Sequence, residues 1–212
     1  MKIVATSDTH FPVDVSKIPD GDVFIHAGDL MNTGYLSEWA AALEWLGKLP
    51  HKIKLYIPGN HDFHLQVYPG PALQDLRKIG VTVLGFPGNS HYDSYTLPNG
   101  MSVLGVGGAT NLPRWAFNRT EAELAEYFAL TQRHDIVVTH APTHGCLDMV
   151  RGNHTGVISY RNFLYDTKPK IWIHGHIHEC YGTFDYFDTK VYNVAMCDRN
   201  SQQVNAPMII EV

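Results

Sequence analysis

The sequence predicts an α/β fold in which short buried strands alternate with helices. Apolar runs of strand length, rich in β-branched residues and bounded by Gly or Pro, recur along the chain. Between two of these runs, apolar residues follow one another at helical spacing. The chain has 212 residues, of which 44% are hydrophobic and 17% charged, so it can bury one large core. Because no linker or internal repeat divides the sequence, we expect residues 1–212 to form a single domain.

The first half of the chain contains three predicted strands and two predicted helices. The first helix covers residues 36–46, where Ser37 can cap its start and Gly47 can end it. The second helix covers residues 72–79 and stops at Gly80. The strands occupy residues 2–6, 22–25 and 54–57, and polar residues follow each of them directly.

The second half opens with the strongest short hairpin signal in the sequence, Asn99-Gly100, which joins residues 92–97 to residues 101–106. Thr120 and Glu123 form a capping box at the start of a further helix. Two more apolar runs predict buried strands that end in polar residues, and the tail alternates in the manner of antiparallel strands. These segments are residues 135–139, 170–173, 181–187, 190–195 and 208–212.

Composition excludes several classes of protein. No apolar run reaches the roughly 20 residues that a membrane span requires, and the N-terminus has no signal-peptide core. The three cysteines, Cys146, Cys180 and Cys197, are widely spaced and predict no disulfide framework, which suits a reducing compartment. The net charge is −5 and the basic residues are scattered, which disfavours a long nucleic acid as partner. We therefore expect a cytoplasmic protein without a membrane or long nucleic-acid partner.

Polar side chains that can bind metals follow five of the predicted strands. In α/β sheets the loops at the carboxyl ends of the strands meet in one crevice, where ligands bind. Unpaired polar groups beside a buried sheet would be costly, so a shared ligand is the better explanation. The residues concerned are Asp8 and His10, Asp29, Asn60 and His61, His140, and His176 with His178.

The types of donor atom indicate which metals this crevice would hold. Oxygen and imidazole donors without thiolate suit Mn, Fe, Zn or Ni better than they suit a structural zinc site. These eight residues offer at least seven ligands, which are too many for one such ion and about right for two, held roughly 3.5–4 Å apart by a shared carboxylate. The sequence therefore predicts a centre with two divalent metal ions and hydrolytic chemistry.

The order of these blocks resembles the signature of the calcineurin-like metallophosphoesterases. The matching blocks are Asp8-Thr9-His10, Gly28-Asp29, Gly59-Asn60-His61-Asp62, Thr139-His140 and Gly175-His176-Ile177-His178. The resemblance implies a sandwich of two mixed β-sheets flanked by helices. It also implies an attack on phosphorus by a hydroxide shared between the two metal ions.

The same resemblance assigns a role to each matching residue. It implies that Asp8, His10 and His178 bind the first metal, that Asn60, His140 and His176 bind the second, and that Asp29 bridges them. His61 is similar to the histidine that contacts substrate and protonates the leaving oxygen. Asp62 would orient His61 and raise its basicity.

A narrower resemblance points to the MPPED branch of the family. It rests on Trp115-Ala116-Phe117-Asn118 and on Glu179 and Tyr181-Gly182 after the last histidine block. Members of that branch hydrolyse phosphodiesters, including cyclic nucleotides in some cases. Two positions depart from the expected pattern. Asn32 stands where the family block Gly-Asp-x-x-Asp has its second aspartate, and Cys180 stands where the branch has glycine.

The substrate must be selected by the loops around the crevice. Arg114, Trp115 and Asn118 are candidates for holding a nucleoside by stacking and hydrogen bonding. The leading hypothesis is a phosphodiesterase that acts on a small diester, with cyclic nucleotides as first candidates. The alternatives are a phosphomonoesterase, a protein phosphatase or a nuclease on the same core, and a scaffold without catalysis. The intact histidine blocks disfavour the scaffold.

Overall fold

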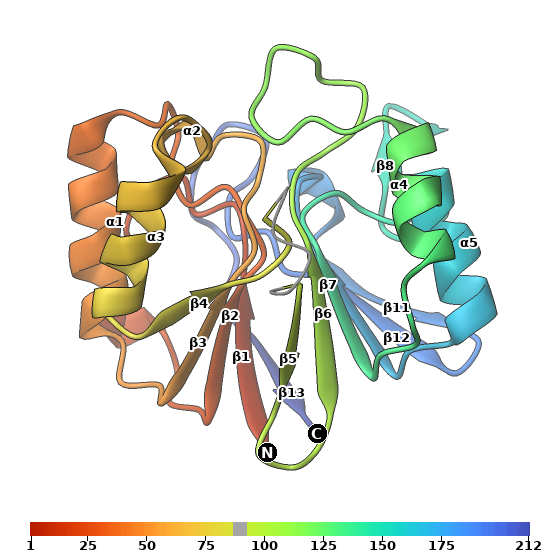
Figure 1. Ribbon diagram of the computed structural model, residues 1–212, viewed down its shortest axis with the longest axis horizontal. Helices are drawn as coiled ribbons and strands as arrows, with labels where there is room; N and C mark the ends of the chain where they lie inside the picture. The colour runs from red at the N-terminus through yellow and green to blue at the C-terminus, as the bar shows by residue number, and fades with distance from the viewer. Residues whose placement is uncertain (87–92) are drawn as a thin grey trace.

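Two mixed sheets lie face to face between two layers of helices in the computed structural model, which describes residues 1–86 and 93–212 (Figure 1). The first sheet has the strand order β13-β1-β2-β3-β4, and the second has the order β11-β12-β10-β7-β6-β5. The sandwich of two mixed sheets flanked by helices that the sequence predicted is confirmed.

Four strands of the first sheet are parallel, and the last strand of the chain closes one edge. The parallel strands are β1 (Lys2–Thr6), β2 (Val23–His26), β3 (Ile53–Tyr56) and β4 (Val81–Val83). The closing strand β13 (Met208–Glu211) runs antiparallel to β1. The carboxyl ends of β1, β2 and β3 therefore lie at the same edge.

The second sheet has a parallel centre and antiparallel edges. Its central strands are β6 (Ser102–Val106), β7 (Ile136–Thr139), β10 (Ile171–His174) and β12 (Thr189–Asn193). The edge strands β5 (Ser94–Thr96) and β11 (Gly182–Tyr186) are antiparallel to their neighbours. A separate hairpin consists of β8 (Met149–Val150) and β9 (Asn153–His154).

Helices cover the outer face of each sheet. On the first sheet these are α1 (Leu36–Lys48), α2 (Phe63–Val67) and α3 (Pro69–Lys78), and on the second they are α4 (Glu121–Ala129) and α5 (Ile158–Thr167). Short 3₁₀ turns, η1 (Val15–Lys17) and η2 (His178–Cys180), lie in the loops. No helix in the described part of the chain is long and apolar enough to cross a membrane.

Side chains alternate between the two faces of each strand, which produces three apolar layers. Ile3, Ile25 and Leu55 point inward and pack against Val138 and Ile173 of the opposite sheet. The outward residues of each sheet pack against its own helices in two further clusters. Burial of the central layer therefore holds the two sheets, and the loops at their ends, in one arrangement.

Several helix boundaries differ from the sequence prediction. Tyr35, not Ser37, is the N-cap residue of α1, and it caps without a side-chain hydrogen bond. The helix continues through Gly47 to Lys48, and α3 begins at Pro69 because proline is well tolerated in the first helical turn. Helices α2 and α5 and the β8–β9 hairpin had no predicted counterpart.

Other predicted signals are confirmed. The Thr120 hydroxyl accepts a hydrogen bond from the Glu123 amide, while the Glu123 carboxylate accepts one from the Thr120 amide. The Asn99-Gly100 hairpin joins β5 to β6. Tyr92, where its first strand was predicted to begin, lies outside the described residues.

Candidate metal centre

The polar blocks after the strands meet at one edge of the two sheets. Asp8 and His10 follow β1, Asp29 follows β2, and Asn60 follows β3. On the opposite sheet, His140 follows β7, while His176 and His178 follow β10. The parallel register of both sheets brings these loops together, as the sequence predicted for the carboxyl ends of the strands.

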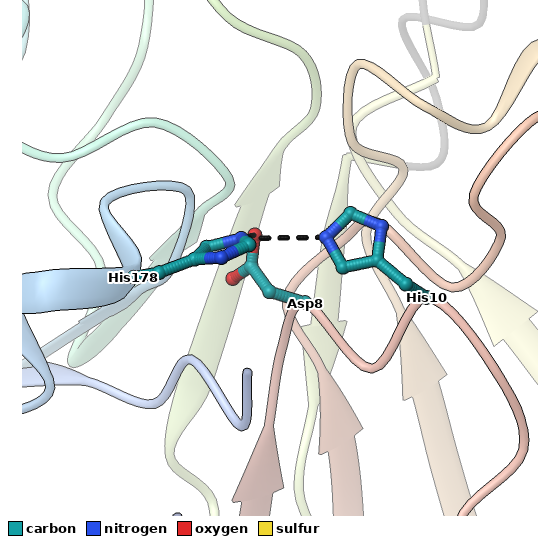
Figure 2. A group of neighbouring side chains, drawn as sticks. All are labelled: Asp8, His10 and His178. Atoms are coloured by element: carbon teal, nitrogen blue, oxygen red, sulfur yellow. Dashed lines mark hydrogen bonds and ion pairs between the residues drawn. The ribbon is translucent and has the colours of Figure 1, made fainter. Parts of the chain in front are cut away.

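One group of potential ligands joins the two sheets through Asp8, His10 and His178. Figure 2 shows the three side chains converging from the loop after β1 and from η2. The Nε2 atoms of His10 and His178 face each other at 3.3 Å, and His178 Nε2 lies 3.3 Å from Asp8 Oδ1. The other Asp8 oxygen, Oδ2, accepts hydrogen bonds from the Ser7 hydroxyl and the His176 amide. Asp8 Oδ1 is thus the carboxylate oxygen that remains available to bind a metal ion.

A second group contains Asp29, His140 and His176. His140 Nε2 lies 3.3 Å from Asp29 Oδ1 and 2.9 Å from Asn60 Oδ1. The predicted ligands of the second metal, together with the predicted bridge, are therefore near neighbours.

The two groups are linked by a third, which consists of His10, Asp29 and His61. Asp29 belongs to the second and third groups, and His10 belongs to the first and third. Asp29 Oδ1 accepts the His61 amide, while Oδ2 lies 4.0 Å from His61 Nε2. Asp29 therefore occupies the position between the two clusters that a bridging carboxylate requires.

Backbone carbonyl oxygens determine which nitrogen each imidazole presents to the centre. The Nδ1 atom of His140 contacts the Ala27 oxygen at 2.9 Å, and that of His178 contacts the Asp198 oxygen at 2.8 Å. Because a carbonyl only accepts, each Nδ1 must carry the proton and donate it. In the neutral imidazole the lone pair then lies on Nε2, which faces the centre and can bind a metal.

Two features show that this donor set fits metal ions. His10 Nδ1 is buried without a hydrogen-bond partner among the described residues, and buried Asp8 Oδ1 has only the His178 imidazole beside it, at 3.3 Å. Such groups are costly unless something satisfies them. Two glycines also leave room at the carboxylates. A Cβ atom at Gly59 would collide with Asp29 Oδ1, and one at Gly175 would collide with Asp8 Oδ2. The residues present therefore fit a pair of divalent ions with oxygen and imidazole ligands.

Ionised carboxylates lie beside protonated imidazoles in the centre. Burial opposes the charge of Asp8 and Asp29, but the neighbouring histidines lower the pKa of both carboxyls well below the usual range. Burial lowers the pKa of His140 and His178, yet Asp29 and Asp8 outweigh it and raise each pKa to about 9. Burial lowers the pKa of His176 to about 4, so this imidazole is neutral. Divalent ions would displace the protons of His140 and His178.

Four of the predicted ligands have a left-handed backbone. The φ angles are 50° at Asp8, 52° at His10, 55° at Asp29 and 68° at His176. Such angles are unfavourable for residues other than glycine and are tolerated where surrounding structure imposes them, often at functional sites. The strain is thus concentrated where the side chains must converge.

Asp62 has a different role from the one predicted for it. Its carboxylate is fully buried and accepts backbone N–H groups from Gly59, Asp29, Leu30 and Met31, at 2.6 to 3.2 Å. The partner of His61 Nδ1 is instead the Asn32 carbonyl oxygen, at 2.5 Å. The expectation that Asp62 orients His61 is therefore wrong, since Asp62 fastens the β2 and β3 loops together and the Asn32 backbone orients the imidazole. A backbone oxygen leaves no signal in the sequence that could have revealed this.

The three predicted substrate-binding residues have three different environments. The Trp115 ring is 39% exposed and its centroid lies 4.3 Å from that of His61, so it borders the centre. The Asn118 side-chain oxygen accepts a hydrogen bond from the Leu112 amide within the same loop. Arg114 is exposed on the same loop.

Comparison with known proteins gives independent information on this chain. The family model described as calcineurin-like phosphoesterase matches residues 1–180. Metallophosphoesterase domain-containing protein 1, from Homo sapiens and from Mus musculus, is 32% identical over 230 residues, which cover 100% of this chain and 71% of the relative.

Solved structures with the same fold include two bacterial proteins. A phosphopantetheinyl hydrolase from Mycobacterium tuberculosis superimposes with a TM-score of 0.63 and 16% identity, over 94% of this chain and 90% of that one. A protein from Thermus thermophilus superimposes with a TM-score of 0.60 and 18% identity, over 91% and 88% of the two chains. At these identities the structures support the fold alone.

Proposed function

Since the chain belongs to the calcineurin-like phosphoesterase family, we propose that it hydrolyses small phosphodiesters, with cyclic nucleotides as first candidates. Metal-dependent phosphoester hydrolysis by a dinuclear centre is the property of the family. The observation that carries the proposal is the pair of ligand groups joined by Asp29 and His10, with His61 beside them. Preference for a diester is supported by the 32% identity to a member of the MPPED branch over the whole chain.

In this proposal each ligand group holds one ion. Asp8, His10 and His178 would hold the first, Asn60, His140 and His176 would hold the second, and Asp29 would serve both. The donors are carboxylate, amide and imidazole, which suit Mn, Fe, Ni or Zn, and manganese is the first ion to test. When bound, the two ions supply positive charge for the phosphoryl oxygens and lower the pKa of water.

His61 is the proposed general acid. Its Nδ1 proton is directed at the Asn32 carbonyl, so the proton that can be transferred is the one on Nε2 of the imidazolium. Trp115 packs against the ring and restricts its rotation. As the oxygen of water bonds to phosphorus, the bond to the leaving oxygen breaks and that oxygen receives the Nε2 proton. The attacking water loses its own proton to solvent.

The proposal also concerns where the protein works and what it meets. Its three cysteines are free thiols in the structure, which supports a reducing compartment such as the cytoplasm. The acidic net charge of −5 supports a small substrate rather than a long nucleic acid.

Hydrolysis of two chromogenic esters tests the substrate class. Protein stripped of metal is reloaded with Mn, Ni, Fe or Zn, and its kcat/KM is measured with bis-p-nitrophenyl phosphate and with p-nitrophenyl phosphate. We expect the diester to be preferred by roughly tenfold or more, which corresponds to about 1.4 kcal/mol of transition-state stabilisation. A panel of cyclic nucleotides then follows.

Other outcomes would assign the centre differently. Preference for the monoester would make the protein a phosphomonoesterase or protein phosphatase, and cleavage of single-stranded DNA in preference to either ester would make it a nuclease. A protein that binds two ions and hydrolyses neither ester at any pH from 5 to 10 would be a scaffold, and the proposal would be wrong.

A further inference from the structure

The segment that follows β12 joins the two sheets beside the candidate metal centre. The Val194 amide donates to the His174 carbonyl at the end of β10, at 2.8 Å, and the Val194 carbonyl accepts the Ser7 amide after β1, at 3.0 Å. The Met196 amide then donates to the Ser7 carbonyl at 2.9 Å, which continues the contact as a parallel bridge. Residues 194–205, here called the connecting segment, therefore tie the end of β1 to the end of β10.

The connecting segment reaches the loop of His10 through the side chain of Gln203. The Gln203 amide group donates one hydrogen bond to the Thr9 carbonyl, at 2.9 Å, and another to the Phe11 carbonyl, at 3.1 Å. These carbonyls flank His10, whose φ of 52° is unfavourable for a residue other than glycine. Both N–H donors of one side chain are thus bonded to the backbone around one predicted ligand.

The backbone of Gln203 is itself held by the buried part of the connecting segment. Gln203 and Cys197 form an antiparallel bridge, and the Val204 amide donates to the Met196 carbonyl at 3.0 Å. Cys197 is fully buried, and its Sγ atom lies 3.6 Å from the same Thr9 carbonyl that Gln203 contacts. Because this backbone is already fixed, its side chain can hold a neighbouring loop at a smaller cost in conformational entropy.

The same stretch of chain holds His178, which belongs to the same ligand group as His10. The Asp198 carbonyl accepts the Nδ1 proton of His178 at 2.8 Å. Asn193, fully buried at the end of β12, donates from its side-chain amide to the Ile177 carbonyl at 2.9 Å. The connecting segment and the residue before it therefore support two of the three members of this group.

The second ligand group is oriented from elsewhere. The Nδ1 atom of His140 is held by the Ala27 carbonyl, directly after β2. Within the described part of the chain, the Gln203 side chain makes its hydrogen bonds to the His10 loop and none to the loops that carry Asn60, His140 or His176. Loss of the Gln203 side chain should therefore affect one ion and not the other.

We propose that Gln203 is a positioning residue for the first metal ion, which holds the backbone of His10 so that its Nε2 atom stays 3.3 Å from that of His178. The inference rests on the proposed function, because it places one ion among Asp8, His10 and His178. It adds a residue beyond 1–180, the part that the family model matches. Without the two hydrogen bonds the His10 loop would leave its left-handed conformation more often, and the ion would bind more weakly.

Manganese binding by Gln203→Ala tests this assignment. Metal-stripped protein is titrated with Mn²⁺ by calorimetry, and the bound ions per chain are counted by atomic emission after equilibrium dialysis. We expect the wild type to bind two ions, whereas in Gln203→Ala the affinity for one ion falls by roughly tenfold or more and the other is unchanged. Gln203→Met, which has a side chain of similar length without donors, should behave in the same way.

The matched control is Gln202→Ala, at the preceding residue, which is also exposed. The Gln202 side-chain amide contacts the Asn200 carbonyl at 3.4 Å and does not reach the His10 loop. This variant should bind both ions as the wild type does. The urea midpoint of metal-stripped Gln203→Ala should equal that of Gln202→Ala, because both changes are made at exposed side chains.

Two further backgrounds show which ion is affected. His178→Ala removes a member of the first ligand group, and His140→Ala removes a member of the second, so each should keep one ion. Adding Gln203→Ala should cause no further loss in the His178→Ala background. In the His140→Ala background it should weaken the remaining ion by the same factor as in the wild type, since residues that serve different ions act independently.

Each other result has a definite meaning. Wild-type affinity for both ions in Gln203→Ala or in Gln203→Met would overturn the inference and leave the proposed function in place. Equal weakening of both ions would also overturn it, because Gln203 would then support the whole centre. Selective loss of one ion from a protein whose wild type hydrolyses neither chromogenic ester would overturn the proposed function and keep the positioning role. A wild type that binds fewer than two ions would overturn both.

Discussion

The two sheets contribute chemically different halves to the candidate metal centre. The loops of the first sheet supply both carboxylates, Asp8 and Asp29, together with His10, Asn60 and His61, whereas the described loops of the second sheet supply three imidazoles and no carboxylate. The carboxylates are held ionised by the imidazoles opposite them, and two of those imidazoles gain protons in return. The difference teaches that each of the two groups proposed to hold an ion takes its ligands from both sheets, so that carboxylates of one sheet and imidazoles of the other are held together.

Removing the central carboxylate should break the centre completely. Asp29→Asn keeps the shape of the side chain but removes the charge that both ligand groups share. We expect metal content to fall from two ions per chain to below one and kcat/KM to fall by at least about 10³-fold. Atomic emission on dialysed protein and the diester assay measure both. The same change at Asp185, an exposed carboxylate in β11, is the control, and two retained ions in Asp29→Asn would refute the bridging role.

His61 belongs to the carboxylate half but is proposed to act on substrate. His61→Ala should therefore keep two metal ions and lose roughly 10²–10⁴-fold in kcat, the usual contribution of a general acid. His134→Ala, at a partly buried histidine that belongs to none of the ligand groups, should behave as wild type. A smaller loss with a p-nitrophenolate leaving group than with a methoxide leaving group would support the assignment, because p-nitrophenolate needs little protonation. Loss of metal in His61→Ala would place this residue among the ligands instead.

Asp62 supports the loops after β2 and β3, which carry Asp29 and Asn60, by accepting hydrogen bonds from their backbone. Asp62→Asn replaces one of the two oxygens that each accept two backbone N–H groups by an NH2 group that cannot accept, so we expect a loss of about 2–4 kcal/mol in the free energy of unfolding. Urea denaturation of metal-free protein measures this loss directly. An unchanged midpoint would show that these loops hold their geometry without the carboxylate.

The imidazole half should make metal-free protein sensitive to alkaline pH. The pKa values of His140 and His178 in the folded chain are about 9, above the 6.5 of an unperturbed histidine. Their protons therefore stabilise the fold fully below pH 6.5, and this contribution is lost as pH rises towards 9. Thermal unfolding after chelation should show the midpoint falling over this interval. With bound divalent ions the midpoint should be higher and the fall smaller, and a flat profile in the stripped protein would contradict the charge pairing.

The smallest effect is expected at Asn32, where the sequence departs from the family block. His61 is held by the Asn32 backbone carbonyl, so the side chain at this position is not needed for that contact. Asn32→Asp should change kcat/KM by less than about threefold, in line with substitutions away from critical contacts. A larger gain would indicate that the natural side chain loosens the centre.

The sequence predicted which candidate ligands would meet better than it predicted the backbone conformations and hydrogen bonds that hold them there. Asp8, Asp29, His140 and the histidines after β10 could be identified because their residue types and their places at strand ends both follow from the order of residues. The left-handed backbone at Asp8 and His176 could not, since it is imposed by packing of neighbouring loops. The carbonyl partners of His61 and His178 are equally invisible, because every residue has a carbonyl group.

The fold shows the same division between strong and weak signals. Strands such as β1 and β10 were predictable because they are continuous apolar runs. Helix α5 was missed because buried Tyr160 and Phe163 alternate with polar residues in a weakly amphipathic segment. The two-residue strands β8 and β9 are too short to produce a periodic pattern.

The pairing of β13 with β1 has a consequence for how the protein acquires its structure. These strands lie at opposite ends of the described chain, yet they are neighbours in the sheet that carries Asp8 and His10. Contacts so distant in sequence raise the contact order and slow folding, and a ribosome-bound chain must wait for residues 208–211 before this sheet is complete. During that wait the edge of β1 is open to pairing with other chains, so expression at low temperature or with chaperones should favour the native product over aggregates.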